Sequence, residues 1–254
     1  MFSSLAMARE MRLIWRAVAK LICCAGNTMV ASPLCTPAYS TCSEIPYSTT
    51  IEAIMEKLLS NLKKEQIEAF FVPDKESAKE KVIEIIEKKR TLCGKNAKDV
   101  RVSWGGSVTL DECGIREAVC ERYDALNPYA PKTPAEQNEA KRQALLSDVF
   151  LMGTNALCES GELVNIDGNG NRLGALIFGP ETVIIVVGKN KIVPDIESAY
   201  ARIKKIACVK NAMRLNRDTP CAKTGECGNC YKGGAIPFPI ITTRCDGKEE
   251  NDAT

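Results

Sequence analysis

The stretch TVIIVVG, Thr182–Gly188, is the part of the sequence that decides the fold. Its apolar residues follow one another without a break, and most of them are β-branched. A strand that is apolar on both faces has to be covered on both faces, as in a parallel sheet with helices packed above and below it. The stretch therefore predicts a central strand, buried on both faces, in an α/β sheet.

Helical and strand patterns alternate on either side of this strand. The expected helices cover residues 51–65, 74–89, 133–148 and 194–207, and a shorter one begins at Thr109, with Glu112 in a capping box. The expected strands cover residues 67–73, 100–107 and 148–157, and a hairpin is expected over 161–180, with its turn at Asp167–Gly170. The core-facing residues expected in the last helix are Ile196, Ala199, Tyr200, Ile203 and Ile206. The order of the elements predicts an open, mostly parallel α/β sheet with an antiparallel hairpin section.

The composition excludes several kinds of chemistry. The chain has 254 residues, a formal net charge of +2 and no histidine. The lack of histidine rules out catalytic imidazole groups and mixed cysteine–histidine zinc sites, so any soft metal must be held mainly by thiolates. No window holds the roughly 20 consecutive apolar residues that a transmembrane helix needs. A nearly neutral chain also gives no general reason to expect nucleic acid as a partner.

The thirteen cysteines are scattered through long helical and strand patterns. Secreted proteins held together by disulfides are usually small and rich in loops. We therefore expect mostly reduced thiols and a cytoplasmic protein.

A cationic run extends from Arg202 to Arg217, with no acidic residue between Glu197 and Asp218. Tyr200 is the only aromatic residue near it, so the rings on which bases stack are missing. We expect this run to dock a partner protein or to form the outer side of a helix.

The first 47 residues differ from the rest of the chain. Their basic residues Arg9, Arg12, Arg16 and Lys20 share one face of an amphipathic helical pattern. Three interpretations stay open: a transit peptide (which would make the protein organellar), a helix on a membrane surface, or sequence upstream of the true start codon. The possible later starts are Met7, Met11, Met29 and Met55. We set residues 1–47 apart as an extension, and assign 48–218 to one α/β domain and 219–254 to a cysteine-containing tail.

Three stretches of the chain together resemble the LUD domain, the domain of lactate-utilisation protein C. They are WGGSVTLDECGI (104–115), GTNALCESGELVNIDGNGNRLGALIFGPETVIIVVGKNKIV (153–193) and NAMRLNRDTPCAKTGECGNC (211–230). The resemblance implies a Rossmann-like fold of the NagB/RpiA/CoA-transferase type. It also implies a part in the oxidation of L-lactate to pyruvate, beside oxidoreductase subunits that carry iron–sulfur clusters.

Two positions depart from the family pattern. Cys158 stands where threonine is common, and a fourth cysteine after a short spacer is missing beyond Cys230. The next cysteine, Cys245, comes later, which leaves the fourth ligand of a four-cysteine site open.

The first candidate ligand site lies at the carboxyl ends of two predicted strands. Gly105, Gly106, Ser107 and Thr109 follow one strand, and Lys189 and Lys191 follow the central one. Ligands of open α/β sheets bind at this edge, where free backbone N–H groups and a lysine could hold a carboxylate or a phosphate. The alternative is a tight turn and a solvated loop.

A polar segment after residue 154 forms a second candidate wall. Its candidate ligand-binding residues are Asn155, Asp167, Asn169 and Asn171. If Asn165, Asp167 and Asn169 alternate along a strand, they share one face. Glu159 and Glu162 are candidates for acid–base work, or for a nucleophile by analogy with the CoA-transferase-like fold. The alternative is a solvent-exposed face with turn-forming residues.

The third candidate is a metal site near the end of the chain. Cys221, Cys227 and Cys230 are spaced C-x5-C-x2-C, and the C-x2-C pair is a common half-site for zinc or an iron–sulfur cluster. Cys245 is the candidate fourth ligand. A redox pair and plain structural thiols are the alternatives.

These observations lead to one main hypothesis and two alternatives. The main hypothesis is a LUD-domain protein in lactate or 2-hydroxy-acid utilisation that binds a small anionic metabolite and works with iron–sulfur partners. The alternatives are a stand-alone transferase or isomerase and a non-catalytic metal-binding scaffold.

Overall fold

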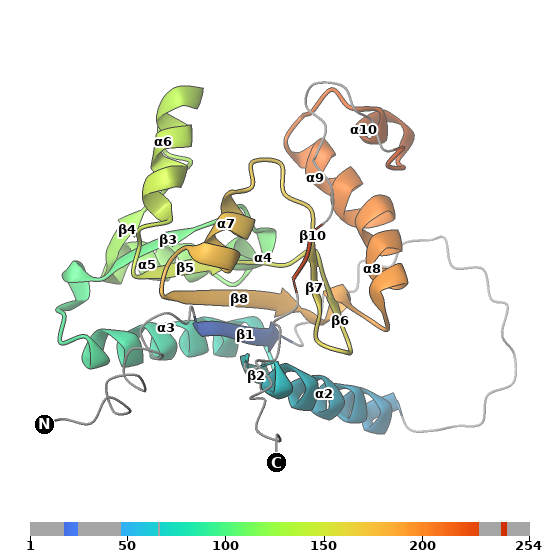
Figure 1. Ribbon diagram of the computed structural model, residues 1–254, viewed down its shortest axis with the longest axis horizontal. Coiled ribbons are helices and arrows are strands. Elements are labelled where there is room, and N and C mark those ends of the chain that lie inside the picture. The colour runs from blue at the N-terminus through green and yellow to red at the C-terminus, as the bar shows by residue number, and fades with distance from the viewer. Residues whose placement is uncertain (1–17, 25–46, 66, 229–239, 243–254) are drawn as a thin grey trace, which may run out of the picture.

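The molecule is built on a parallel sheet, shown in the computed structural model of Figure 1, which describes residues 18–24, 47–65, 67–228 and 240–242. In the described chain six strands pair in the order β2-β1-β8-β5-β3-β4, and every neighbouring pair is parallel. The strands are β1 (Val18–Cys24), β2 (Glu68–Val72), β3 (Arg101–Trp104), β4 (Asp124–Leu126), β5 (Val149–Met152) and β8 (Thr182–Gly188). The predicted open α/β sheet is confirmed.

The central strand β8 is buried on both faces, as its sequence predicts. Ile184 and Val186 belong to one core cluster, and Val183, Ile185 and Val187 belong to another. Side chains alternate across a strand, so each cluster lies on one face of the sheet. The first is covered by α3 (Lys75–Leu92), α4 (Val108–Glu112) and α5 (Ile115–Arg122). The second is covered by α2 (Tyr47–Lys64), α6 (Pro134–Ala144) and α7 (Asn171–Phe178).

A smaller sheet stands beyond the carboxyl end of β8 (Figure 1). Its described strands pair in the order β10-β7-β6-β9, with β7 antiparallel to both its neighbours and β6 parallel to β9. The strands are β6 (Ala156–Cys158), β7 (Leu163–Asn165), β9 (Ile192–Val193) and β10 (Ile240–Thr242). Ala199 of α8 (Ile196–Arg202) packs on this sheet with Ile203.

The remaining elements are short. They are the 3₁₀ turns η1 (Ala97–Asp99) and η2 (Lys189–Lys191), the π-helical turn η3 (Ile203–Ala207), and the helices α9 (Cys208–Arg214) and α10 (Pro220–Thr224). Among the helices of the described residues, none combines the length and the hydropathy that crossing a membrane requires.

The segment set apart as an N-terminal extension contributes a strand to the sheet. The amphipathic helix expected there is wrong for β1, which lies between β2 and β8. Leu21, Ile22 and Cys23 are at most 1% exposed. A short apolar run is typical both of a strand that is covered on both faces and of a buried helical segment. Periodicity alone does not distinguish these two structures, which is why the sequence predicts a helix here.

The expected hairpin over 161–180 is also misplaced. The antiparallel pair is β6 with β7, and the segment after Gly170 is α7 rather than a strand. Asp167 accepts hydrogen bonds from the backbone N–H groups of Arg172 and Leu173, at 2.9 and 3.4 Å, which satisfies the first turn of a helix. Asp167 and Asn169 lie beyond β7, so they do not share a strand face with Asn165.

The helix expected at 194–207 contains a π-helical turn. Ala199 and Ile203 face the core as predicted, but Ile206 is 41% exposed and Cys208 is 3% exposed. A π turn adds a residue to one helical turn, so the inward position moves past Ile206.

The helix expected to begin at Thr109 begins at Val108 and ends after five residues, with Ser107 as its N-cap residue. The carboxylate of Glu112 forms an ion pair with Lys75, at 2.9 Å.

Candidate functional site

A cleft lies at the edge of the main sheet where three strands end. Its walls include Ser107 after β3, Gly153 after β5 and Lys191 after β8. The arrow of β8 points toward the smaller sheet and α8, which stand at this edge (Figure 1). Ligands of open α/β sheets bind outside the carboxyl ends of the strands, so this cleft is where the fold predicts a ligand.

The base of the cleft holds an amine and a hydroxyl on either side of a glycine. The Nζ of Lys191 donates a hydrogen bond to the Oγ1 of Thr109, at 2.8 Å. A Cβ atom built on Gly153 would lie 3.4 Å from this Nζ and 2.7 Å from the Oγ of Ser107. Ser107 is 8% exposed, and its hydroxyl has no hydrogen-bond partner among the described residues. The absence of a Cβ on Gly153 therefore lets the Ser107 hydroxyl and the Lys191 amine both lie close to this residue, where a side chain would collide with the hydroxyl.

The charge of Lys191 is poorly compensated. No carboxylate of the described chain forms an ion pair with it. Burial, followed by the charges of Arg202 and Arg172, lowers the pKa of Lys191 to about 8, against a smaller opposing effect of Glu112 and Cys113. A lysine in this state favours the binding of an anion, because the anion would restore the missing negative charge.

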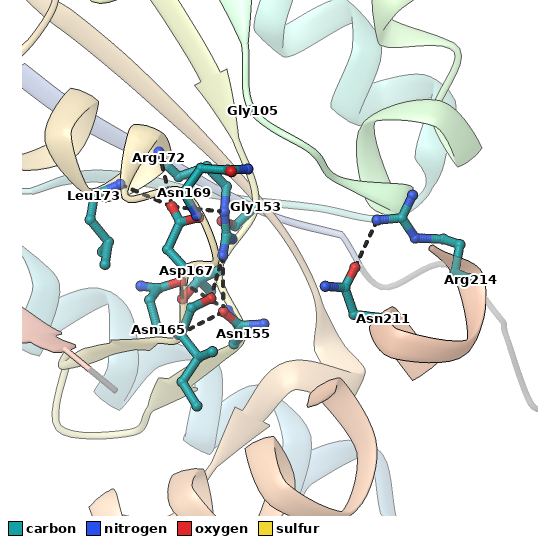
Figure 2. Close-up of polar contacts among 12 residues, drawn as sticks. Gly105, Gly153, Asn155, Asn165, Asp167, Asn169, Arg172, Leu173, Asn211 and Arg214 are labelled. Carbon is teal, nitrogen blue, oxygen red and sulfur yellow. Dashed lines mark hydrogen bonds and ion pairs between the residues drawn. The ribbon is translucent and has the colours of Figure 1, made fainter. Parts of the chain in front are cut away.

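Arg172 ties together the loops that form one side of the cleft. Its guanidinium donates to the carbonyl oxygens of Gly153 and Ile166, at 3.2 and 2.7 Å, and lies 3.4 Å from the carboxylate of Asp167. Figure 2 shows this side chain among Gly153, Asn155 and Asp167. The side chains of Arg172 and Asp167 are 12% and 6% exposed, so this is a nearly buried ion pair that holds the site in shape.

Two predicted ligand residues belong to this framework. The Oδ1 of Asn155 accepts from the backbone N–H of Ile166 and from Arg172, at 3.0 and 3.3 Å. Asp167 uses its carboxylate to cap α7 and to pair with Arg172. Both residues line the cleft, but their oxygens are occupied by other parts of the protein.

The glycines after β3 differ from each other. Gly105 donates its N–H to the carbonyl of Leu151, at 2.9 Å, so that N–H is committed to the sheet. A Cβ on Gly105 would lie 2.3 Å from the Cγ of Arg172, so a protein side chain, rather than a ligand, makes the close approach there. Gly106 lines the cleft, as do Ser107 and Thr109.

The other predicted polar residues are spread around the rim. Asn169 is exposed, and its N–H donates to Asp167 at 3.3 Å. Asn171 lines the cleft, and its buried Nδ2 has no partner among the described residues. Lys189 is exposed in the same turn as Lys191.

The two candidate carboxylates separate at the turn between β6 and β7. Glu159 lines the cleft and lies 3.7 Å from the ammonium of Lys57. Glu162 accepts a hydrogen bond from the hydroxyl of Ser160 and does not line the cleft. Of these two candidates, Glu159 is the one that lies where it could take part in chemistry in the cleft.

The cysteine motif is only partly described. Cys221 is 6% exposed and packs with Val209 and Ala212, while Cys227 is partly buried against the same cluster. Cys230 and Cys245 lie outside the described residues. The described chain holds no group of three or more cysteine and acidic residues that is arranged to bind a metal ion.

Cys158, the departure from the family pattern, is fully buried in the smaller sheet. Burial, with the charges of Glu162 and Asp195, raises the pKa of this thiol to about 11. Cys158 is therefore a packing residue and not a nucleophile.

Two functional arginines escape analysis of the sequence. Arg172 is the only charged residue in the stretch NRLGALIF (171–178), which is apolar from Leu173 on, and a single charge beside an apolar run is the signal that could have revealed it. Arg202 is hidden inside the cationic run; its Nε donates to the carbonyl of Asn190, at 3.0 Å, and Nη1 donates to that of Asn155. Further along the same wall, Arg214 donates to Asn211 at 2.7 Å (Figure 2).

Comparison with known proteins identifies the family. A model of the LUD domain matches residues 55–236, a region that includes every strand of the main sheet except β1 and all three loops at the base of the cleft. No curated protein and no solved structure matches the chain. Since the matched region is more than half of the 254 residues, the chain belongs to the LUD domain family.

Proposed function

We propose that this LUD-domain protein acts in the utilisation of lactate or a related 2-hydroxy acid, and that its cleft binds the acid or its oxidised product as an anion. Family membership supports the relation to lactate utilisation. The observation that carries the binding site is the pair formed by Lys191 and the unpartnered Ser107 hydroxyl around Gly153.

The donors at the base of the cleft suit a small carboxylate. An ammonium group has three N–H donors, and Thr109 accepts one from Lys191. The remaining donors and the hydroxyl of Ser107 match the oxygens of one carboxylate. Arg172 and Arg202 add positive potential without being the primary contacts, because both guanidiniums already hold backbone carbonyl groups.

Titration calorimetry of the purified full chain with lactate, pyruvate and inorganic phosphate at pH 7 tests this proposal. Lys191→Met is expected to weaken binding by about tenfold or more, which corresponds to about 1.4 kcal/mol. Lys189→Met is the matched control, because that lysine is exposed in the same turn, and its affinity is expected to change less than twofold. Failure of both lactate and pyruvate to bind, whether or not phosphate binds, or equal effects of the two substitutions, would overturn the proposal.

We also propose that Cys221, Cys227, Cys230 and Cys245 hold an iron–sulfur cluster or zinc at which the iron–sulfur partners of the pathway dock. Two of these cysteines support the proposal. Cys221 lies in α10 and Cys227 follows it, and both pack in one small hydrophobic cluster that borders the cleft. An all-thiolate set fits either group, and a bound cluster would supply electron transfer.

Metal and sulfide analysis of protein purified without oxygen tests the cysteine site. Cys221→Ser is expected to lose the bound metal. Cys93→Ser changes an exposed cysteine that is distant in sequence from the motif, and this variant is expected to keep the metal. Wild-type protein without metal, or equal metal in both variants, would refute the cysteine site and leave the anion site standing.

A further inference from the structure

Lys191 lies in surroundings that suit a reactive amine better than a permanent cation. Arg172 and Arg202 oppose its charge, and Glu112, which favours the charge, is already paired with Lys75. With a pKa of about 8, about a tenth of the amine is uncharged at pH 7. An ordinary lysine with a pKa near 10.4 has fewer than about one in a thousand uncharged. The uncharged amine is the form that attacks carbonyl groups.

The amine is held in place beside the space of the cleft. Thr109 holds Nζ through one hydrogen bond, and Lys191 lines the cleft together with Gly153 and Ser107. The hydroxyl of Ser107 borders the same space and has no partner among the described residues. A carbonyl group placed there would meet the amine at its carbon and the hydroxyl at its oxygen.

We propose that Lys191 forms an imine with the carbonyl carbon of a 2-oxo acid bound in the cleft. The substrate class rests on the proposed function, because a 2-oxo acid is what oxidation of a 2-hydroxy acid yields. The Nζ lone pair forms the C–N bond as the carbonyl π bond opens, giving a carbinolamine. The carbinolamine then loses its hydroxyl group as water. Overall, one ammonium and one carbonyl give one protonated imine and one water, with no oxidant or reductant.

The hydroxyl of Ser107 has a separate role in this step. It can donate a hydrogen bond to the carbonyl oxygen and then to the departing hydroxyl group, where negative charge develops. Arg202 favours a ligand that carries a carboxylate. Its positive charge is close enough to lower the pKa of Lys191, and its Nη2, which has no hydrogen bond within the described chain, is left as a donor for a carboxylate oxygen.

Reductive trapping of the full-length protein tests the imine. Protein incubated with pyruvate and sodium cyanoborohydride is expected to gain one stable adduct, located at Lys191 by peptide mass mapping. Lys189, two residues away and exposed, is the internal control and is expected to stay unmodified. Lactate, which has no carbonyl group to attack, is expected to give no adduct. The trapping rate is expected to rise about tenfold from pH 6 to pH 7 and to level off above pH 8, following the uncharged amine.

Lys191→Arg separates the imine from anion binding. This variant keeps a cation but has no amine that can form an imine, so it is expected to lose the adduct; calorimetry with pyruvate measures separately how much anion binding it retains. Pyruvate that binds wild-type protein without any adduct at Lys191, or adducts spread equally over exposed lysines, would overturn the imine and leave the proposed function intact. Failure of both lactate and pyruvate to bind wild-type protein would instead remove the proposed function, and the imine with it.

Discussion

Gly105 shows at the scale of one residue how the cleft depends on an absent side chain. Its missing Cβ is what allows Arg172 to pass, because that atom would lie 2.3 Å from Cγ and 2.8 Å from Cδ of the arginine. Arg172 in turn holds the loops after β5 and β7 together. The glycine therefore shapes the cleft through a neighbouring side chain instead of through its own N–H group.

Gly105→Ala is expected to destabilise the protein by about 1–3 kcal/mol, the usual effect of overpacking a filled site. Gly168→Ala is the control, since nothing lies within 4 Å of its Cβ position. Urea unfolding followed by circular dichroism compares the two. Equal unfolding midpoints for both variants would show that Arg172 moves aside freely.

The lowered pKa of Lys191 is expected to make the free energy of unfolding rise with pH. Its pKa of about 8 in the folded state lies below the ordinary value of 10.5, so between these values the unfolded chain binds more protons. Stability then rises with pH across this window, and the unfavourable burial of the charge is present in full below pH 8.

Between pH 7 and pH 10, the free energy of unfolding of wild-type protein is expected to rise relative to Lys191→Met by on the order of 2 kcal/mol. Lys189→Met is expected to follow the wild-type curve. Urea unfolding of the three proteins at several pH values measures the differences. Parallel curves for wild type and Lys191→Met would contradict the lowered pKa.

At the scale of the elements, β1 is the strand that links β2 to the rest of the main sheet. It pairs in parallel with β2 on one side and with β8 on the other. Its buried residues Leu21 and Cys23 join one core cluster and Ile22 joins the other. A chain that starts at Met29 or Met55 would lack this strand and leave an exposed edge on β8.

A chain beginning at Met29 is therefore expected to lose cooperative unfolding and most of its soluble yield. A chain beginning at Met11 keeps every residue of β1 and is expected to unfold with the wild-type midpoint. Thermal unfolding followed by circular dichroism distinguishes the two. A Met29 chain with a wild-type transition would mean that the sheet is stable without β1.

The π-helical turn η3 between α8 and α9 adds one residue to a helical turn and so changes which side chains face the core. Arg202 ends α8 just before the π-helical turn, and Cys208 begins α9 just after it. An uninterrupted α-helix would bury Ile206; the π turn buries Cys208 instead, at 3% exposed. π turns are frequent at functional sites, and here the turn lies beside the cleft.

At the scale of the whole molecule, the two core clusters share β8. Ile184 contributes to one cluster and its neighbour Ile185 to the other, and both are fully buried. A strand that belongs to both clusters couples the two helical layers, so the main sheet and its helices should unfold as one unit.

Ile184→Ala and Ile185→Ala are each expected to lower the free energy of unfolding by about 2–5 kcal/mol, the usual effect of removing a large buried side chain. In each variant, made in a Trp15→Phe background so that tryptophan fluorescence comes from Trp104 alone, fluorescence and circular dichroism should report the same midpoint, although Trp104 belongs to the Ile184 cluster only. Ile177→Ala, at a residue 61% exposed, is the control and should unfold like wild type. Separate midpoints from the two probes would show that the layers unfold independently.

Local patterns predict much of this fold. The unbroken apolar run of β8 and the helical spacing in α2 and α3 are each contained in a short stretch of chain. The elements that were mispredicted are those in which a local pattern fits two structures. A short apolar run suits β1 as well as a helix, and the residues after Gly170 suit a strand until Asp167 caps them as α7.

The candidate site was predicted less completely than the fold. Ser107, Thr109 and Lys191 could be proposed because chain order puts them at the carboxyl ends of strands. Their meeting around Gly153 could not, since it depends on β5 lying between β3 and β8 in the sheet. The framework role of Arg172 was missed for the same reason, because its partners come from the loops after two different strands, β5 and β7.

The sequence by itself determined the α/β class, the central strand and the family, because these depend on local periodicity and on motifs contiguous in the chain. Only the tertiary structure decided that β1 belongs to the sheet, that Arg172 serves as framework, and that Lys191 is a partly buried amine without a carboxylate partner in the described chain. The physical reason is that burial and charge compensation depend on which residues meet in space. A lysine on the surface and one partly buried in a cleft have the same side chain, and Lys189 and Lys191 differ only in what surrounds them.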